Sequence, residues 1–522
     1  MKILIYIPIF VAYNLVAQQP KKLTEKFFPD FDIEISTPAF QKKKGFTKYH
    51  EMMDFLNDFI KKSHGLCQME FIGTSQNGFK IPILYFSNSS KKEKIKVFFM
   101  GGLHGNEPAS TEGMLFLISK LMSADTLEKM LSEIDLAILP MANIDGYQKQ
   151  DRYAKNGLDL NRDQTKLIAP ESVLIKKTVN KFNPDVVVDF HEYKPYRADF
   201  VHFGSFGITQ KYDAMFLYSG NLNVSPSIRN ITENLFVKNA QQVLDKNNLT
   251  HHNYFRSKKY NKKLQFNLGG ISPRSSATNY ALANCISILM EIRGVGLDRV
   301  SFNRRVMTAI LLANSYLETT LSNTEKIKSA LEKAKKFSDS IVVRSYNTKE
   351  EFNFSTIDVY ERKYIEIPIE VNNALKSNPS KKRKRPTFYI IDPELEKVAE
   401  KLKLLGLDIS KTQAEKMLNV EIFNIESVQN SNVLFEGFYP TVVSASTKTE
   451  NISIPKGAFV VNMNQKKSNL AVETLEPEAI AGFVRYNVIS PEETKYIYRF
   501  HSNISPWKYN FIKPFLSYFF WE

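Results

Sequence analysis

The sequence predicts an α/β protein with a mixed, mostly parallel sheet flanked by helices, followed by a smaller, mainly β unit of the α+β type. Up to about residue 320, short apolar runs typical of buried strands alternate with amphipathic segments of helical length. From about residue 340, short β-like runs predominate instead. A chain of 522 residues is also too long for one ordinary core, so two or three domains are expected.

The elements of the first unit can be placed in order. An apolar stripe over 52–60 predicts a helix, and a hairpin follows, with strands at 69–72 and 81–86 around a Gly-rich turn. Later buried strands are predicted at 97–100, 136–139, 186–190 and 288–290, and later helices at 114–121, 171–181, 281–287 and 302–317. Residues 205–280 are less regular, and we expect them to supply long loops.

The boundaries follow from these patterns. We expect a lead-in segment over 18–45, the α/β unit over 46–325, a charged helical linker over 326–340 and a C-terminal accessory domain over 341–522. The accessory domain contains one clear helix, which Asp392 caps, Pro393 begins and Gly406 ends.

The net charge of +15 first raises the question of nucleic acid. The lysines are mostly scattered, however, so a basic surface is favoured and no nucleic-acid partner is expected. The one dense run, 381–385, lies between two prolines and is interpreted as an exposed loop.

The first seventeen residues have the pattern of a signal peptide. Met1-Lys2 precedes an apolar run that ends at Ala17, where a cut is possible, and the run is short for a membrane span. We therefore expect an exported protein, periplasmic or secreted, without a stable membrane span. The two cysteines, Cys67 and Cys285, exclude a disulfide scaffold, although one bridge between them stays open beside the interpretation as buried thiols.

Three residues form a candidate metal site. His104 and Glu107 lie three apart in a Gly-rich turn at the end of the strand 97–100, and His191 ends the strand 186–190. Imidazole and carboxylate are ordinary zinc ligands, and a catalytic zinc needs three protein ligands with one open position. Ligands of open α/β sheets lie at the carboxyl ends of the strands. We therefore predict one zinc ion bound by these residues.

Other polar residues complete the chemistry. Glu291 follows the apolar run 288–290 and is the predicted general base, unless it only pairs with Arg293. Arg152 can polarise a carbonyl, and Asp159 can orient a ligand histidine. Asn161 and Arg162 offer an amide and a planar guanidinium that suit a carboxylate.

Together these residues resemble the M14 family of zinc metallocarboxypeptidases. The matching motifs occur in the family's order within residues 45–320 and are the His104 to Glu107 turn, Asn143-Ile144-Asp145-Gly146, Asp159-Leu160-Asn161-Arg162, Asp189-Phe190-His191 and Glu291-Ile292-Arg293-Gly294. The resemblance implies a zinc carboxypeptidase-like fold and hydrolysis of peptide bonds at the C-terminal residue. It also implies that Glu291 shuttles the proton and that Asn161 and Arg162 bind the terminal carboxylate.

The sequence departs from the family in several places. Asn-Ile-Asp-Gly replaces the usual Asn-Pro-Asp-Gly, and Glu192, not a small residue, follows His191. The family's mobile tyrosine has no secure match, and Tyr280 is not assigned to it. Arg274 can read an acidic substrate or be an exposed loop arginine, and the second is favoured. Residues 386–490 are similar to the appended domain of some bacterial members and contain no ligand cluster.

Two other functions stay open. One is a zinc amide hydrolase of the aspartoacylase or succinylglutamate desuccinylase type, in which the Gly-x-His-Gly-Asn-Glu-Pro motif seen here at 102–108 is also frequent. The other is an inactive module that binds peptides or cell-wall stems, although the three ligands and the base are all present. Peptidoglycan stem peptides are a further substrate if the protein is periplasmic. Nothing in the sequence indicates an oligomeric state.

Overall fold

The computed structural model describes residues 19–502 except 64, 91, 122–123 and 261–262. In this part of the chain the centre is an eight-stranded mixed sheet of order β1-β2-β4-β3-β5-β11-β7-β8. Its strands are β1 (Cys67–Thr74), β2 (Lys80–Phe86), β3 (Ile95–Met100), β4 (Ile134–Leu139), β5 (Val186–Tyr193), β7 (Ala214–Leu217), β8 (His251–Asn253) and β11 (Ile286–Arg293). The α/β fold predicted from the sequence is confirmed.

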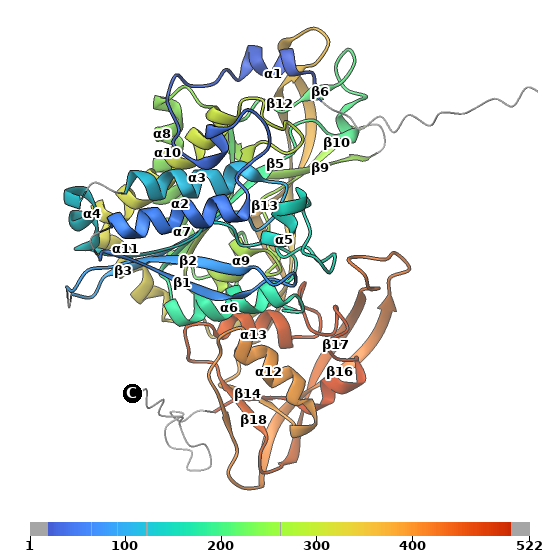
Figure 1. Ribbon diagram of the computed structural model, residues 1–522. Coiled ribbons are helices and arrows are strands. Elements are labelled where there is room, and N and C mark those ends of the chain that lie inside the picture. The colour runs from blue at the N-terminus through green and yellow to red at the C-terminus, as the bar shows by residue number, and fades with distance from the viewer. Residues whose placement is uncertain (1–18, 64, 91, 122–123, 261–262, 503–522) are drawn as a thin grey trace, which may run out of the picture.

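The four central strands decide where the site lies. β4, β3, β5 and β11 are parallel neighbours, so their carboxyl ends meet at one edge of the sheet. Every residue of β5 is buried, as is typical of a strand covered on both faces. Figure 1 shows α2 (Tyr49–Lys62) and α6 (Pro170–Phe182) on opposite sides of β1 and β2.

Besides α2 and α6, the helices of the first part of the chain include α1 (Lys21–Phe27), α3 (Pro108–Lys120), α4 (Ala124–Leu131), α5 (Ile144–Lys149), α9 (Ser276–Leu282), α10 (Phe302–Ser322) and α11 (Thr324–Ala334). Helices α2, α3, α6 and α10 lie at the positions that the sequence predicts, whereas α1, α4 and α5 were not predicted. The helix expected over 281–287 is wrong in position, because α9 ends at Leu282 and β11 begins at Ile286. None of the described helices is long and apolar enough to cross a membrane, and the predicted signal peptide, 1–17, lies outside the described residues.

The expectation of long loops over 205–280 is wrong. This stretch contains β6 (Ile208–Thr209), β7, β8, β9 (Phe255–Tyr260) and β10 (Lys263–Leu268), with α7 (Pro226–Ile231), a π-helical segment (Thr232–Val237), α8 (Lys238–Lys246) and α9. These strands are two to six residues long, too short for a clear alternation of apolar and polar residues.

A second sheet joins the two halves of the chain. Its order is β6-β12-β13-β10-β9, and the long hairpin of β12 (Ser340–Asp358) and β13 (Lys363–Lys384) supplies the middle. β12 pairs with β6, and β13 pairs with β10, so residues after 340 complete a sheet begun by residues before 270. Phe255, Phe266 and Phe354 pack as aromatic neighbours in its core.

The C-terminal part forms a third sheet of order β15-β18-β14-β19-β16-β17, seen at the bottom of Figure 1. Its elements are β14 (Phe388–Ile391), α12 (Glu396–Leu404), β15 (Ile409–Lys411), β16 (Lys416–Asn430), β17 (Thr441–Ile454), β18 (Phe459–Asn462), α13 (Ser468–Leu475) and β19 (Ile497–Phe500). Asp392 accepts a hydrogen bond from the amide of Glu394, as its capping role predicts. The mainly β, α+β character expected for this part is confirmed.

The structure decides two further expectations, one about the basic run 381–385 and one about the two cysteines. The basic run 381–385 is not an exposed loop, because most of it belongs to β13 and Arg383 is paired with Glu476 at 2.7 Å and with Glu478 at 2.5 Å. Cys67 and Cys285 are buried free thiols, so the bridge left open by the sequence does not form.

Candidate active site

The three predicted metal ligands come together at the carboxyl edge of the central sheet. His104 and Glu107 lie in the turn after β3, and His191 lies near the end of β5. Glu107 places one carboxylate oxygen 2.8 Å from His104 Nδ1 and the other 2.8 Å from His191 Nδ1. The two Nδ1 atoms are 3.0 Å apart, and all three side chains are buried.

The Nε2 atom of each imidazole, on the side away from Glu107, lies near a carboxylate. His104 Nε2 is 3.0 Å from Asp159, and His191 Nε2 is 2.9 Å from Asp189. These carboxylates favour a proton on each Nε2, which leaves the Nδ1 lone pairs directed at one point beside the Glu107 carboxylate. Such a convergence of electron pairs is repulsive unless a cation lies among them. The donor set therefore fits a zinc ion.

The pKa directions agree that the pocket favours positive charge. Burial alone would raise the pKa of Glu107, but His104 and His191 hold it well below its usual range. Burial would lower the pKa of His191, yet Asp189 and Glu107 raise it well above its ordinary value.

The turn that carries the ligands is held against α5. A Cβ on Gly105 would lie 2.0 Å from the carbonyl carbon of Gly146, so only glycine allows this approach. Asn143 caps α5 by accepting a hydrogen bond from the Gly146 amide at 3.0 Å. Asp145 accepts bonds from Ser75 and from the Asn77 amide. The Asn143-to-Gly146 motif thus supports the metal turn and links it to the β1–β2 turn.

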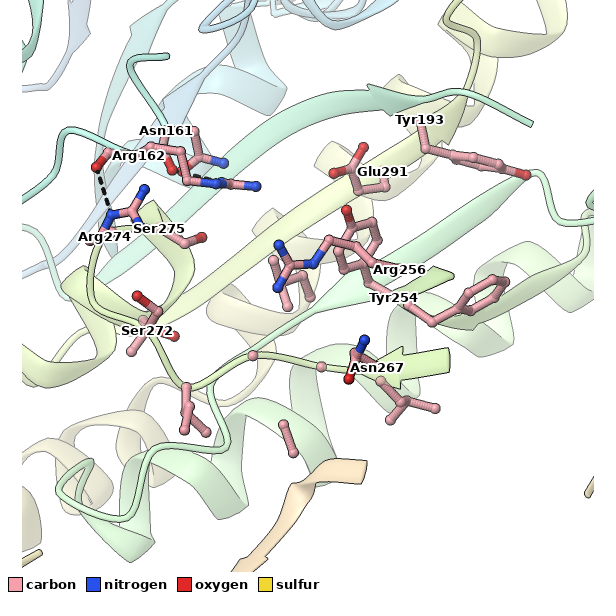
Figure 2. A pocket seen from close by; sticks show the side chains of 18 of the residues that line it. Asn161, Arg162, Tyr193, Tyr254, Arg256, Asn267, Ser272, Arg274, Ser275 and Glu291 are labelled. Atoms are coloured by element: carbon pink, nitrogen blue, oxygen red, sulfur yellow. Dashed lines mark hydrogen bonds between the residues drawn. The ribbon is translucent and has the colours of Figure 1, made fainter. Parts of the chain in front are cut away.

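Glu291 lies beside the three ligands. Its Cα is in register with that of His191 on the neighbouring parallel strand, and its half-buried carboxylate lines the cleft. Burial, followed by the charge of Glu107, raises the pKa of Glu291 to about 8. Figure 2 shows the Tyr254 hydroxyl directed toward it.

The ion pair with Arg293, the structural alternative for Glu291, does not form, and the neighbouring acid Glu192 is bound elsewhere. Arg293 donates to Gln19 at 2.6 Å and stacks over the Phe28 ring at 3.8 Å, instead of pairing with Glu291. Glu192, the other nearby acid, accepts bonds from Arg305 and from the Ala109 amide, each at 2.8 Å. A Cβ on Gly294 would overlap Glu192, which explains a glycine there.

The predicted arginines and amide line one cleft of about 760 Å³. Arg152 donates to Asp159 through Nε at 3.0 Å and Nη2 at 2.9 Å. Asn161 accepts a bond from the Ser276 amide at 2.8 Å, and Arg162 donates to the Asn161 carbonyl at 2.8 Å. The side chains of Asn161 and Arg162 lie along the cleft from Glu291 (Figure 2).

Arg274 is not the exposed loop arginine that the sequence favoured. It is buried, donates to the Tyr486 hydroxyl at 2.7 Å and is hydrogen-bonded to Glu436. Both partners come from the C-terminal part of the chain. The same part contributes Val433, Phe435 and Arg485 to the cleft wall, so residues on both sides of position 340 form this cleft.

Tyr254 and Arg256 are among the cleft residues that sequence reasoning missed. Tyr254 directly precedes β9 and Arg256 is its second residue, inside the stretch expected to be loop. Their spacing of two places side chains on one face of a strand, and this was the one available signal. Tyr280, which the sequence did not assign, is buried in α9 beside Lys176, outside this cleft.

Comparisons with known proteins agree with this geometry. The model of the zinc carboxypeptidase family, Peptidase_M14, matches residues 52–326. That is more than half of the chain, so the chain belongs to this family, and it is a peptidase of the metallocarboxypeptidase type. The match also confirms the extent of the resemblance seen in the sequence.

Individual relatives cover different shares of the chain. It is 28% identical over 462 residues to carboxypeptidase 2 of Trichophyton rubrum, which spans 85% of this chain and 84% of that protein. It is 30% identical over 139 residues to carboxypeptidase SOL1 of Arabidopsis thaliana, or 26% of this chain and 28% of that protein. The solved structure of carboxypeptidase A from Helicoverpa armigera is 18% identical, with a TM-score of 0.41 over 58% of this chain and 81% of the other.

Proposed function

We propose that this peptidase is a zinc-dependent carboxypeptidase that removes the C-terminal residue of a peptide. One observation carries the proposal: His104, Glu107 and His191 converge beside Glu291, and Glu291 lines the same cleft as Asn161 and Arg162. A site for bond cleavage and a site for a terminal carboxylate thus share one cavity.

His104, Glu107 and His191 would hold one zinc ion, with Asp159 orienting His104. When bound, zinc supplies Lewis-acid polarisation and lowers the pKa of a water molecule. Glu291 then accepts the proton of the attacking water and returns it to the leaving amine. Arg152 stabilises the negative charge that develops on the scissile carbonyl. No covalent enzyme intermediate is required.

The terminal carboxylate would bind at Asn161 and Arg162. The side chain of Glu436 supports this assignment, because its carboxylate lies 4.0 Å from Arg162 Nε and is bonded to Arg274. The space beside Arg162 and Arg274 therefore accommodates a carboxylate, that of Glu436. A planar guanidinium suits such a partner, since it can donate two parallel hydrogen bonds.

We also propose that the protein is exported, on the signal-like pattern of residues 1–17, and that peptides, including peptidoglycan stem peptides, are its substrates. The division into a catalytic domain over 46–325 and an accessory domain from 341 is part of this proposal. The accessory domain would shape the cleft without taking part in the chemistry, since the predicted ligands and base all precede residue 340.

The test is a comparison of two substrates. Arg162→Ala should weaken cleavage of free-acid peptides by about 10- to 100-fold, the worth of a charged hydrogen bond, and should affect C-terminally amidated peptides far less. Products are identified by mass spectrometry, with and without a chelator. Arg485→Ala is the matched control, since it removes another guanidinium from the cleft wall and should change cleavage of free-acid and amidated peptides by the same factor. Equal losses for Arg162→Ala would indicate an endopeptidase or a deacylase.

A further inference from the structure

The cleft is strongly cationic. Its basic lining residues are Arg152, Arg162, Lys194, Arg197, Arg256, Arg274 and Arg485, whereas Glu192 and Glu291 are its acidic ones. The Glu192 carboxylate is already bound by Arg305 at 2.6 Å. The cleft thus presents an excess of positive charge, and a cleft lined by one sign of charge attracts ligands of the other sign.

The guanidinium groups around Arg256 have carboxylate partners of their own. Arg197 pairs with Asp199 at 3.0 Å, and Glu436 lies against both Arg274 and Arg162. In the part of the chain that the structure describes, the Arg256 side chain has neither an ion pair nor a hydrogen bond. Arg256 is therefore the guanidinium of this group that lacks a counter-charge.

The position of Arg256 is defined by β9. It lies opposite Asn267 in the register of β9 and β10, and its side chain is open to the cleft. Figure 2 shows Arg256 in the middle of the cleft, with Arg162 and Arg274 on one side and Tyr193 on the other. Burial, and the charges of Arg162 and Arg274, lower the pKa of Arg256. A bound anion would relieve this repulsion.

We propose that Arg256 binds the side-chain carboxylate of a C-terminal glutamate or aspartate, so that the enzyme prefers acidic C-terminal residues. The inference rests on the proposed function, because Arg162 must hold the terminal carboxylate for Arg256 to meet the side chain of the same residue. A C-terminal acidic residue carries two carboxylates, and the two guanidinium groups meet one each. Arg274 does not serve this role, since its charge is bound by Glu436.

The first test compares peptides that are identical except for a C-terminal glutamate or its isostere glutamine. The zinc-loaded enzyme should cleave the glutamate peptide with a kcat/KM about 10- to 100-fold higher, as expected for a charge-assisted hydrogen bond. Arg256→Gln should bring the ratio near one by lowering cleavage of the glutamate peptide alone. Arg256→Glu should favour a C-terminal lysine instead.

Arg197→Gln is the matched control. It removes an equal charge from the cleft wall, but that charge is already paired with Asp199, so the glutamate-to-glutamine ratio should remain. A second measurement does not depend on turnover. Calorimetric binding of free glutamate should be tighter than that of free glutamine, and Arg256→Gln should abolish the difference.

The outcomes separate the two proposals. If peptides are cleaved but glutamine is accepted as well as glutamate, the role of Arg256 is overturned while the carboxypeptidase function stands. The role is also overturned if Arg256→Gln lowers cleavage of every peptide equally, because the residue would then act on the reaction and not on specificity. If no peptide with a free C-terminus is cleaved by the zinc-loaded enzyme, both proposals fail.

Discussion

At the scale of single residues, the site is governed by what surrounds each carboxylate. Glu107 and Glu291 are near neighbours, yet their pKa values move in opposite directions. Glu107 lies between two imidazoles, which lower its pKa, whereas burial and the charge of Glu107 raise the pKa of Glu291. A carboxylate with a lowered pKa, such as Glu107, stays ionised and suits a metal ligand. A carboxyl with a raised pKa, such as Glu291, suits a group that exchanges protons. Glu192 is excluded as the proton carrier, because Arg305 and the Ala109 amide hold its oxygens.

Glu291→Gln should keep the fold and the zinc but reduce turnover by about 10²–10⁴-fold, the usual contribution of general acid–base catalysis. Glutamine has the same size but cannot accept the proton of water or return one to the amine. Turnover per zinc-loaded molecule is measured together with thermal unfolding. Near-normal turnover in the folded, loaded variant would show that another group carries the proton.

At the scale of elements, the ligand turn depends on α5. Gly105 lies against the backbone of Gly146 and Tyr147, which belong to that helix. Backbone atoms cannot rotate out of the way as a side chain can. The positions of His104 and Glu107 on either side of Gly105 are therefore set by the packing of the turn on a neighbouring helix.

Gly105→Ala should displace this turn, because its Cβ would lie 2.0 Å from Gly146 and 2.2 Å from Tyr147. Overpacking typically costs about 1–3 kcal/mol, so we expect a lower melting temperature and weaker zinc binding in a metal titration. Gly270→Ala is the control, since its nearest neighbour would be 3.5 Å away. Unchanged zinc affinity in Gly105→Ala would contradict the proposed link between the turn and α5.

At the scale of the whole molecule, the C-terminal part is joined to the rest by buried polar contacts. Glu473 of α13 accepts hydrogen bonds from Asn221 and Asn223, each at 2.8 Å, and these two residues precede α7. Burial raises the pKa of Glu473 from 4.5 to about 7 despite these donors. The folded state therefore favours the protonated carboxyl.

A raised carboxyl pKa makes the folded state lose stability as the pH rises from 4.5 to about 7, because the unfolded chain ionises first. Glu473→Gln removes this ionisation and retains an acceptor for the two asparagines. The variant should melt higher than the natural protein at pH 8, by roughly 1 °C for each kcal/mol relieved in a chain of this length, and by little at pH 4.5. Exposed Glu400→Gln is the control. An equal difference at both pH values would mean that Glu473 is charged in the folded protein.

The sequence by itself determined the central sheet apart from β7 and β8, the ligand turn and the order of the family's motifs. The structure and the family match confirm the fold and the family. These features depend on local patterns, because an apolar run specifies a buried strand and the residues directly after it lie at the sheet edge. The roles of His104, Glu107, His191 and Glu291 stay predictions, although the structure brings these residues together.

Only the tertiary structure decided the composition of the cleft. Arg274 meets Glu436 across 162 positions of sequence, and β13 completes a sheet with β10 more than one hundred residues earlier. Contacts over such separations leave no periodic signal, so the sequence left Arg274 as an exposed arginine and Arg256 unnoticed in a presumed loop. Whether a charged side chain is paired or free depends on which distant segments pack beside it, and this is what the folded chain decides.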